Sequence, residues 1–335
     1  MLRFITIFAA AIFFFFPGLS NAEPIKLKLS FFTSDRSNIY RFSIKPFVDA
    51  VNSDGEGLVH IDVYFSGAIS GVQSQQPQLV ADGGADLAIV VPGQSPERFT
   101  DNAVLELPGI YRNAEEASRV YTRLIEARAI NGYSDYFVAG AFVSRSENIH
   151  SRKPIRSLDD LKALVIRANN RIESEVLEKL GATPVLIPIN QTTEAMSRDK
   201  IDAATFPPSM LFEFGIGRVT SNHFLLNLGG APTALVMNRK VFDRLPERAQ
   251  QIIRKYSKDW LSDRSATEFD RLDRKVIEDL LADPRRKVVN LSAADLVRVN
   301  SVFDSVVHEW VASNPRNGAL LKTVRDVLTQ LRQGE

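Results

Sequence analysis

The chain has 335 residues, with 41 Lys and Arg, 40 Asp and Glu, and no cysteine. The absence of cysteine excludes disulfides, thiol catalysis and thiolate metal sites. The near balance of charge gives no reason to expect nucleic acid or an anionic membrane surface as a partner. This length and a hydrophobic fraction of 44% are typical of a globular protein with one large or two medium domains.

Residues 1–22 have the pattern of a secretory signal peptide. A positive charge at Arg3 precedes the apolar run FITIFAAAIFFFF, and small residues lead up to Ala22. The run is shorter than the ~20 residues that a membrane-spanning helix needs, and no later stretch is long and apolar enough to cross a membrane. We therefore expect cleavage after Ala22 and export of a mature protein that is not embedded in the membrane.

The first part of the mature chain alternates between strand and helix patterns. The segments IKLKLSFF, LVHIDVYF and ADLAIVV predict strands, because they are apolar and rich in β-branched residues. Helices are expected between them, over about residues 38–52 and 75–81. This βαβαβ order predicts a parallel sheet. A helix over residues 115–129 and a buried strand, YFVAGAFV, then lead to the next unit.

The same order recurs in residues 158–208. Here ALVIRA, TPVLIPI and KIDAATF predict strands, with one helix opened by Asn169 or Asn170 and another after Thr192. Ligands of such sheets bind beyond the carboxyl ends of the strands. Two similar units therefore predict an α/β fold of two lobes, whose strand ends face each other across a ligand cleft.

The connections between the units suggest how the chain is divided. YFVAGAFV leads from the first unit to the second, and the apolar strand APTALVMN returns. We assign residues 23–140 and 227–258 to lobe one, and residues 141–226 and 259–335 to lobe two. Two or more crossings between lobes make a hinge.

Residues 245–284 predict a long helix that begins near Pro246 and ends at Pro284. A helix of roughly 36 residues is about 54 Å long, more than the ~30 Å width of a small domain, so it would cross both lobes. The alternative is two helices with a break near Ser262 to Ala266. Ser292 has the spacing of an N-cap for a further helix, and VRDVLTQL predicts the last one.

The chain lacks the sequence motifs of common enzymes. It contains no H-E-x-x-H, no G-x-S-x-G, no P-loop and no G-x-G-x-x-G after a strand. Its four histidines are scattered, and the pair His60 and Asp62 fits a solvated strand face better than a metal site. We therefore predict a binding protein without a cofactor rather than an enzyme.

Six segments together resemble one family of receptors: VYFSGAISG, VADGGADLAIVVPG, SRKPIRSLDDLKALVIRA, LGATPVLIPI, KIDAATFPPS and MNRKVFDRLPERAQQII. Their order and spacing are similar to those of the DctP-type solute-binding receptors of TRAP (tripartite ATP-independent periplasmic) transporters. The resemblance implies a two-lobed periplasmic-binding-protein-like fold with a long helix crossing both lobes. It also implies a periplasmic protein that delivers an organic acid to the membrane subunits of a carrier driven by an ion gradient. A ligand-sensing subunit for a membrane kinase and an exported α/β enzyme remain as alternatives.

Arg167 falls on the position of the carboxylate-binding arginine of this family. A guanidinium offers parallel donors that fit a carboxylate. The alternative for Arg167 is an ion pair with a nearby acid such as Glu173. Asn170 either donates to the ligand or caps the next helix. We expect Arg167 to face an open, hydrated cleft, and its removal to leave the unliganded fold intact.

Departures from the family pattern bear on the ligand. Phe206 stands where many relatives have an asparagine that shares the carboxylate with the arginine. On the strand before Pro154, either Arg145 or Glu147 lines the site, since both lie on the same strand face. The remaining strand ends bring further candidates: Phe32, Pro92, Gly93 and Ile189. One cationic clamp in apolar and aromatic surroundings favours a monocarboxylate with a hydrophobic or aromatic body.

Overall fold

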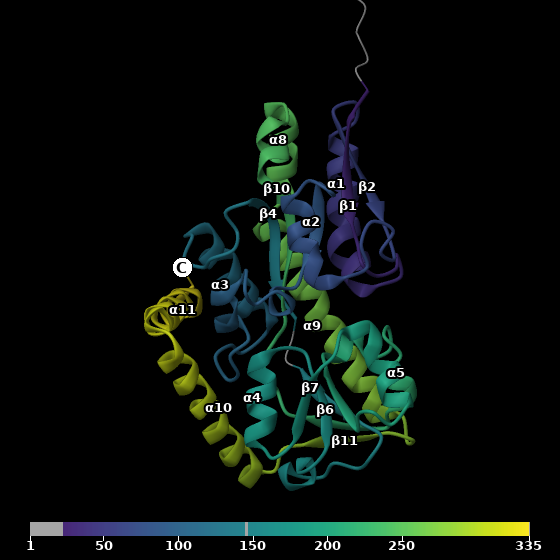
Figure 1. Ribbon diagram of the computed structural model, residues 1–335, viewed down its shortest axis with the longest axis vertical. Helices are drawn as coiled ribbons and strands as arrows, with labels where there is room; N and C mark the ends of the chain where they lie inside the picture. The colour runs from purple at the N-terminus through teal and green to yellow at the C-terminus, as the bar shows by residue number, and fades with distance from the viewer. Residues whose placement is uncertain (1–22, 145–146, 335) are drawn as a thin grey trace, which may run out of the picture.

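The computed structural model describes residues 23–144 and 147–334, and the structural statements below concern these residues. The signal peptide expected at residues 1–22 and the candidate site residue Arg145 lie outside them. The described chain forms two α/β lobes, each built on its own sheet, which confirms the fold class (Figure 1).

The first sheet has five strands in the order β2-β1-β3-β10-β4, with β1 parallel to β2 and β3 and with β10 antiparallel to β3 and β4. Along β1, Leu27 and Leu29 are buried while Lys26 and Lys28 are exposed, the alternation of a half-covered strand. The strands are β1 (Ile25–Ser30), β2 (Val59–Tyr64), β3 (Leu87–Val90), β4 (Tyr136–Val143) and β10 (Pro232–Asn238).

The helices of this lobe pack on the sheet close to where the sequence predicts them. A short π-helical turn runs directly into the first of them, and Asn113 caps the third by accepting a hydrogen bond from Glu116 N at 2.8 Å. The first helix packs against β2, the second against β3 and β10, and the third against β4. They are α1 (Lys45–Asp54), α2 (Gln76–Ala81) and α3 (Ala114–Glu126), and a later helix, α7 (Arg239–Arg244), packs against β4 and β10.

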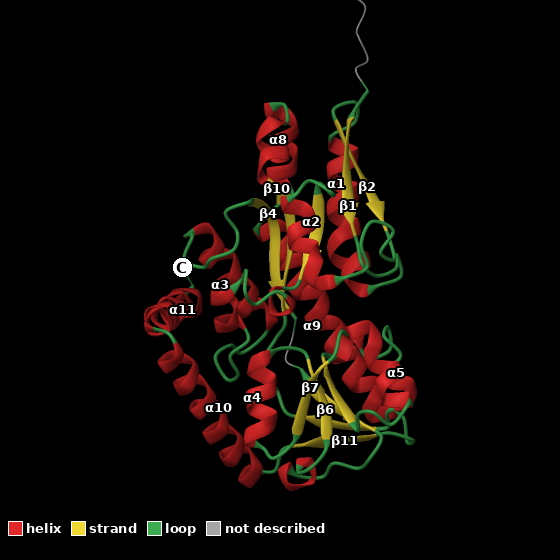
Figure 2. Cartoon of the chain, in the orientation of Figure 1, coloured by secondary structure: helices red, strands yellow, loops and turns green. Residues whose placement is uncertain are grey.

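The second sheet has six strands in the order β11-β9-β5-β8-β6-β7 (Figure 2). β6 is parallel to β7 and β8, β5 is antiparallel to β8 and β9, and β11 is parallel to β9. Neither β9 nor β11 is predicted from the sequence. The strands are β5 (Asn148–Ser151), β6 (Val165–Ala168), β7 (Thr183–Leu186), β8 (Ala203–Phe206), β9 (Asn222–Leu225) and β11 (Lys287–Asn290).

Three helices lie between β6 and β9 along the chain: α4 (Arg171–Lys179), α5 (Thr192–Ser197) and α6 (Ile216–Val219). α4 packs against β6 and β7, and α5 contacts α6. The expected helix after Pro208 is only the 3-10 helix Pro208–Met210, followed by turns up to α6.

The long predicted helix is broken. α8 (Glu247–Lys255) and α9 (Asp259–Ala282) are separate, so a single helix is wrong and the two-helix alternative is confirmed. The break lies at Lys258, ahead of the expected Ser262 to Ala266, which are inside α9. Lys258 has φ 57° and ψ −125°, outside the helical region, and its backbone N–H donates to Ala139 O of β4 at 2.6 Å.

α9 is the helix that crosses both lobes. It packs on α3 and β4 of the first lobe and on β11 and the 3-10 helix Pro208–Met210 of the second (Figure 1). At ~1.5 Å per residue it is about 36 Å long, enough to reach both sheets. A shorter helix than predicted therefore makes the same connection. Between β9 and β10 the chain forms a second link between the sheets.

The last two helices run along one edge of the molecule. Ser292 caps α10 (Ala293–Ser313), since its Oγ accepts from Asp295 N at 3.0 Å, as the sequence predicts. α10 packs against α4, whereas α11 (Pro315–Gln333) packs against α3 of the first lobe. The exact division of the chain into lobes, including these helices, stays a prediction.

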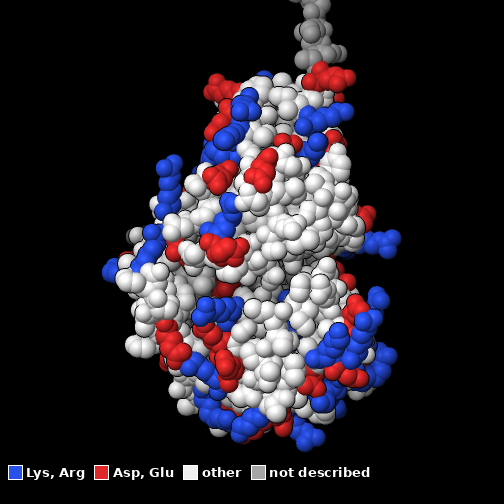
Figure 3. Space-filling model, viewed as in Figure 1, with Lys and Arg blue, Asp and Glu red and all other residues white. Residues whose placement is uncertain are grey.

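The surface carries both signs of charge. On the face seen in Figure 3, Lys and Arg lie among Asp and Glu, without a broad area of one sign. In the ranges 23–144 and 147–334, no helix combines the length and the apolar character that crossing a bilayer requires.

Candidate functional site

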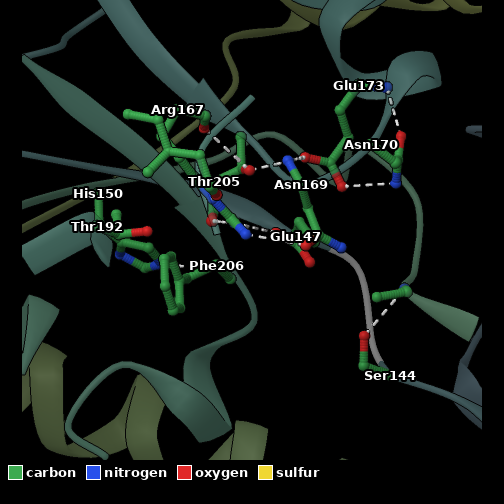
Figure 4. A network of polar contacts seen from close by, with 12 residues as sticks. Ser144, Glu147, His150, Arg167, Asn169, Asn170, Glu173, Thr192, Thr205 and Phe206 are labelled. Carbon is green, nitrogen blue, oxygen red and sulfur yellow. Dashed lines mark hydrogen bonds and ion pairs between the residues drawn. The ribbon is translucent and has the colours of Figure 1, made fainter. Parts of the chain in front are cut away.

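Arg167 lies at the end of β6, inside the molecule (Figure 4). It is 1% exposed, so the expectation of an open, hydrated surrounding is wrong. Its Nε donates to Ile187 O at 3.0 Å, and its Nη1 to Thr205 O at 2.9 Å. Its Nη2 donates to Asn169 Oδ1 at 2.9 Å. The guanidinium is therefore fixed from three sides by neutral acceptors that do not cancel its charge.

Two glutamates share this interior with Arg167. Glu147 Oε2 lies 4.0 Å from Arg167 Nη1, and this oxygen has no hydrogen-bond partner among the described residues. Glu173 is fully engaged elsewhere: its Oε2 accepts from Thr205 Oγ1 at 2.7 Å and from Asn169 N at 3.0 Å. The acid within ion-pair distance of Arg167 is thus Glu147, and not the Glu173 that the sequence suggests.

Asn170 is the N-cap of α4. Its Oδ1 accepts from Glu173 N at 2.9 Å, and its Nδ2 donates to Glu173 Oε1 at 3.1 Å. The residue is 2% exposed. Of the two roles that the sequence leaves open, the contacts show the cap.

The first lobe approaches this network through Gly93 and Glu106. A Cβ on Gly93 would lie 2.6 Å from Glu106 Oε1 and 3.3 Å from Asn170 Cβ, so the close approach requires glycine. Next to it, Gln94 Nε2 donates to Asn169 O at 2.9 Å. Residues of both lobes therefore meet directly at the site.

Burial changes the proton affinities of these acids. Desolvation raises the pKa of Glu106 to about 8, and the charge of Glu173 adds to the shift. Desolvation also raises the pKa of Glu147 well above its ordinary value, with repulsion by Glu173 adding to it and attraction by Arg167 opposing it. The pKa of Glu173 is raised by desolvation, against the hydrogen bonds that it accepts. The site therefore favours neutral acids around one permanently charged guanidinium.

Phe206 forms an apolar wall next to Arg167, whose Cζ lies 5.0 Å from the ring centroid. Behind it, a chain of bonds joins Arg286 Nη1 to His223 Nε2 (3.3 Å), His223 Nδ1 to His150 Nδ1 (2.8 Å) and His150 Nε2 to Phe206 O (3.1 Å). Because arginine can only donate, His223 donates to His150, and His150 donates to Phe206. Desolvation lowers the pKa of His150 to about 4 and of His223 to about 3, so both are neutral at physiological pH.

The other predicted site residues lie just after a strand or at the start of a 3-10 helix. Phe32 follows β1 and stacks 5.9 Å from Phe31, and Ile189 begins a 3-10 helix. Both are partly buried against the apolar cluster that contains Phe206. Pro92 is buried and begins the 3-10 helix Pro92–Gln94, which positions Gly93 and Gln94.

Sequence reasoning missed Glu106 and Thr205. A signal existed for Glu106, which is the lone charge in the run NAVLELPGI, since an acid in an apolar run is seldom buried without a reason. Thr205 gave no signal, because threonine is common in strands.

No metal centre is evident in the part of the chain that the structure describes, where no three His, Asp or Glu side chains form a suitable group. A hollow of about 570 Å³ is lined in part by Phe137, Arg239 and Arg254, away from Arg167. It lies at β4, the edge strand of the first sheet, and is partly open to solvent. The buried polar groups around Arg167 are better evidence of a binding site than this groove.

A two-lobed α/β molecule with a buried cation where the lobes meet defines a class of ligand-binding proteins. Residues 29–314 match the DctP family, described as bacterial extracellular solute-binding protein, family 7. The chain belongs to this family, which confirms the resemblance found in the sequence.

Known relatives are distant in sequence and match two thirds or more of the chain. DctP of Rhodobacter capsulatus, a C4-dicarboxylate-binding periplasmic protein, is 24% identical over 234 residues, 67% of this chain and 68% of that protein. TsaT of Comamonas testosteroni, named an outer membrane transporter protein, is 25% identical over 283 residues, 82% of each chain.

Solved structures of TRAP solute-binding proteins share the fold. One from a marine metagenome has a TM-score of 0.86 at 23% identity, covering 92% of this chain and 99% of that one. One from Rhodoferax ferrireducens T118 has a TM-score of 0.86 at 24% identity, with the same coverage.

Proposed function

We propose that this chain is a periplasmic receptor that binds an aromatic monocarboxylate where its lobes meet and delivers it to the membrane subunits of a TRAP carrier. Membership of an extracellular solute-binding family supports the receptor role and export. The observation that carries the choice of ligand is the pairing of one buried guanidinium with an aromatic wall, Arg167 Cζ lying 5.0 Å from the Phe206 ring.

Arg167 is the proposed carboxylate clamp. Its three acceptors are neutral, and a guanidinium has more N–H groups than they use. Its charge is therefore left for an anion, and enclosure strengthens that attraction. Gly93 allows Glu106 and Asn170 to approach it closely, and Phe32 and Ile189 pack against the apolar cluster that contains Phe206.

The ligands of structural relatives support an aromatic acid. The marine metagenome protein is described as specific for aromatic acid ligands and holds 3-hydroxybenzoate, and the Rhodoferax ferrireducens protein holds copurified benzoate. A relative from Bordetella bronchiseptica holds mandelate. Relatives also bind uronates, which present several hydroxyls. The apolar ring at Phe206 suits a flat ring better than a polyhydroxylated acid.

The test is direct binding. Mass spectrometry of material released from the denatured protein should detect an aromatic acid, and calorimetric titration should show binding of benzoate in preference to succinate. Losing a buried charge partner costs about 2–5 kcal/mol, so Arg167→Ala should weaken benzoate binding by roughly thirty-fold to several thousand-fold. Arg167→Lys should fail to restore it, because an ammonium lacks the fork geometry.

Two controls make the titration decisive. Arg298→Ala removes an exposed arginine that pairs with Asp159 and should leave the affinity unchanged. Near-UV circular dichroism must show that Arg167→Lys is folded. Equal affinity of Arg167→Lys and the parent protein, or stronger binding of succinate than of benzoate, would refute the proposal.

A further inference from the structure

Glu147 is placed against the charge of Arg167 without being bonded to it. Its Oε2 lies 4.0 Å from Arg167 Nη1, the two side chains are 3% and 1% exposed, and this oxygen has no hydrogen-bond partner among the described residues. A buried carboxyl oxygen without a partner costs free energy unless something else bonds to it. Figure 4 shows the Glu147 carboxyl and the Arg167 guanidinium directed toward one another.

The distance of 4.0 Å allows one atom to bridge the two groups. Hydrogen bonds of about 2.7–2.9 Å from each side sum to more than this separation, so a single acceptor oxygen can bond to both. An oxygen that accepts from Arg167 Nη1 therefore comes within reach of Glu147 Oε2. Glu147 can bond to that oxygen only if it carries a proton, because an ionised carboxylate has no donor.

We propose that Glu147 binds the ligand as a protonated carboxylic acid and donates its hydrogen bond to the carboxylate that Arg167 holds, so that each acid anion is bound together with one proton. The inference deepens the proposed function and rests on it. The proton comes from solvent and stays on Glu147, and no bond in the ligand changes.

The charges that face Glu147 favour this protonation. Among the described residues they are Arg167 on β6, Glu173 on α4 and Glu106 just after the 3-10 helix Thr100–Leu105. Two acids against one cation already disfavour an ionised Glu147, and a ligand carboxylate adds another negative charge at close range. Two carboxylates that share one site do not both ionise. Desolvation of Glu147 acts in the same direction.

The inference predicts a pH dependence of binding with a definite sign. Lobe separation would admit water to Glu147, and its proton affinity would then fall toward the ordinary value for a carboxyl group. Binding would restore the buried state and take up the proton. The affinity for benzoate should therefore fall as the pH rises, by up to about tenfold per pH unit if one full proton is taken up.

The experiment is calorimetric titration of the folded mature protein with benzoate between about pH 6 and pH 9, in buffers of different ionisation enthalpy. The parent protein should take up protons on binding. Glu147→Gln, an isosteric donor that does not titrate, should bind benzoate without proton uptake and with little dependence on pH. Glu106→Gln tests the other buried acid of the cluster as the site of the proton. Glu309→Gln, which neutralises an exposed acid paired with Lys179, is the control that should keep the uptake.

Several results of this titration would overturn the protonation of Glu147. Binding of benzoate by the parent protein without proton uptake across this range would overturn it, as would proton uptake that survives in Glu147→Gln. Uptake abolished by Glu106→Gln and kept by Glu147→Gln would assign the proton to Glu106 instead. No binding of benzoate or of other carboxylates at any pH would refute the proposed function itself, a result distinct from pH-independent binding.

Discussion

Replacing Arg167 by alanine should destabilise the protein even without ligand. The guanidinium donates to Ile187 O, Thr205 O and Asn169 Oδ1, and truncation removes all three bonds from a residue that is 1% exposed. It also leaves Glu147 and its neighbours without their nearby cation. A hydrogen bond that involves a charged group is typically worth about 1.5–3 kcal/mol. We expect a loss of this size in the free energy of unfolding, a large share of the ~5–15 kcal/mol of a typical domain.

Urea unfolding without ligand, followed by circular dichroism, measures this loss. Arg167 attracts an ionised Glu147 and so opposes the rise of its pKa, and the variant loses this attraction. The loss should therefore grow as the pH rises through the range in which Glu147 of the folded parent protein ionises. Arg298→Ala is the control, since its ion pairs with Asp159 and Asp295 are exposed and should matter little. Equal unfolding midpoints for both variants would show that the buried contacts of Arg167 contribute nothing to folding.

Three further changes test other parts of the structure. Gly140→Ala places a Cβ 2.5 Å from Leu261 Cδ2, and the overpacking should lower the free energy of urea unfolding by about 1–3 kcal/mol. Burial raises the pKa of Glu106 to about 8, so the stability that its protonated form gives the folded state below about pH 4.5 is lost as the pH rises toward 8. The melting temperature should therefore fall over this range in the parent protein and fall less in Glu106→Gln. Parallel curves of melting temperature against pH for the two proteins would contradict this. Ser292→Ala removes the cap on Asp295 N and should cost about 1 kcal/mol, with Ser292→Thr as the near-neutral control.

The parallel strands and the helices between them could be predicted because their signals are local. Alternation in IKLKLSFF and continuous apolar runs such as YFVAGAFV depend only on near neighbours. The caps at Asn170 and Ser292 are local as well, since each side chain bonds three residues ahead. β9 and β11 were missed, because such short strands are defined by their pairing with distant segments.

The interior of the site could be predicted only in part. Arg167 and Phe206 were found through the family pattern, yet the burial of Arg167 depends on acceptors twenty or more residues away. The sequence gives no measure of how Glu106, on another lobe, approaches Gly93 and Asn170. The break in the predicted long helix lies at Lys258 and not at Ser262 to Ala266 for a similar reason. Its position depends on the hydrogen bond from Lys258 N–H to Ala139 O of β4, which is far away in the sequence.

If the proposed ligand binds at Arg167, which is buried, the lobes must separate to admit it. Gln94 binds Asn169 O at 2.9 Å, and Asn38 binds Glu213 Oε2 at 2.8 Å and Ser209 O at 2.6 Å. Each joins the first lobe to a segment of the second and is worth about 0.5–1.5 kcal/mol net, so opening breaks a few weak bonds rather than one strong one. α9 and the β4–β5 and β9–β10 connections cross between the lobes, so the motion that would free Arg167 is a rotation about these links. On the proposed function, closing the lobes again would exclude water from Arg167 and Glu147 together, so that the two groups would act as one site.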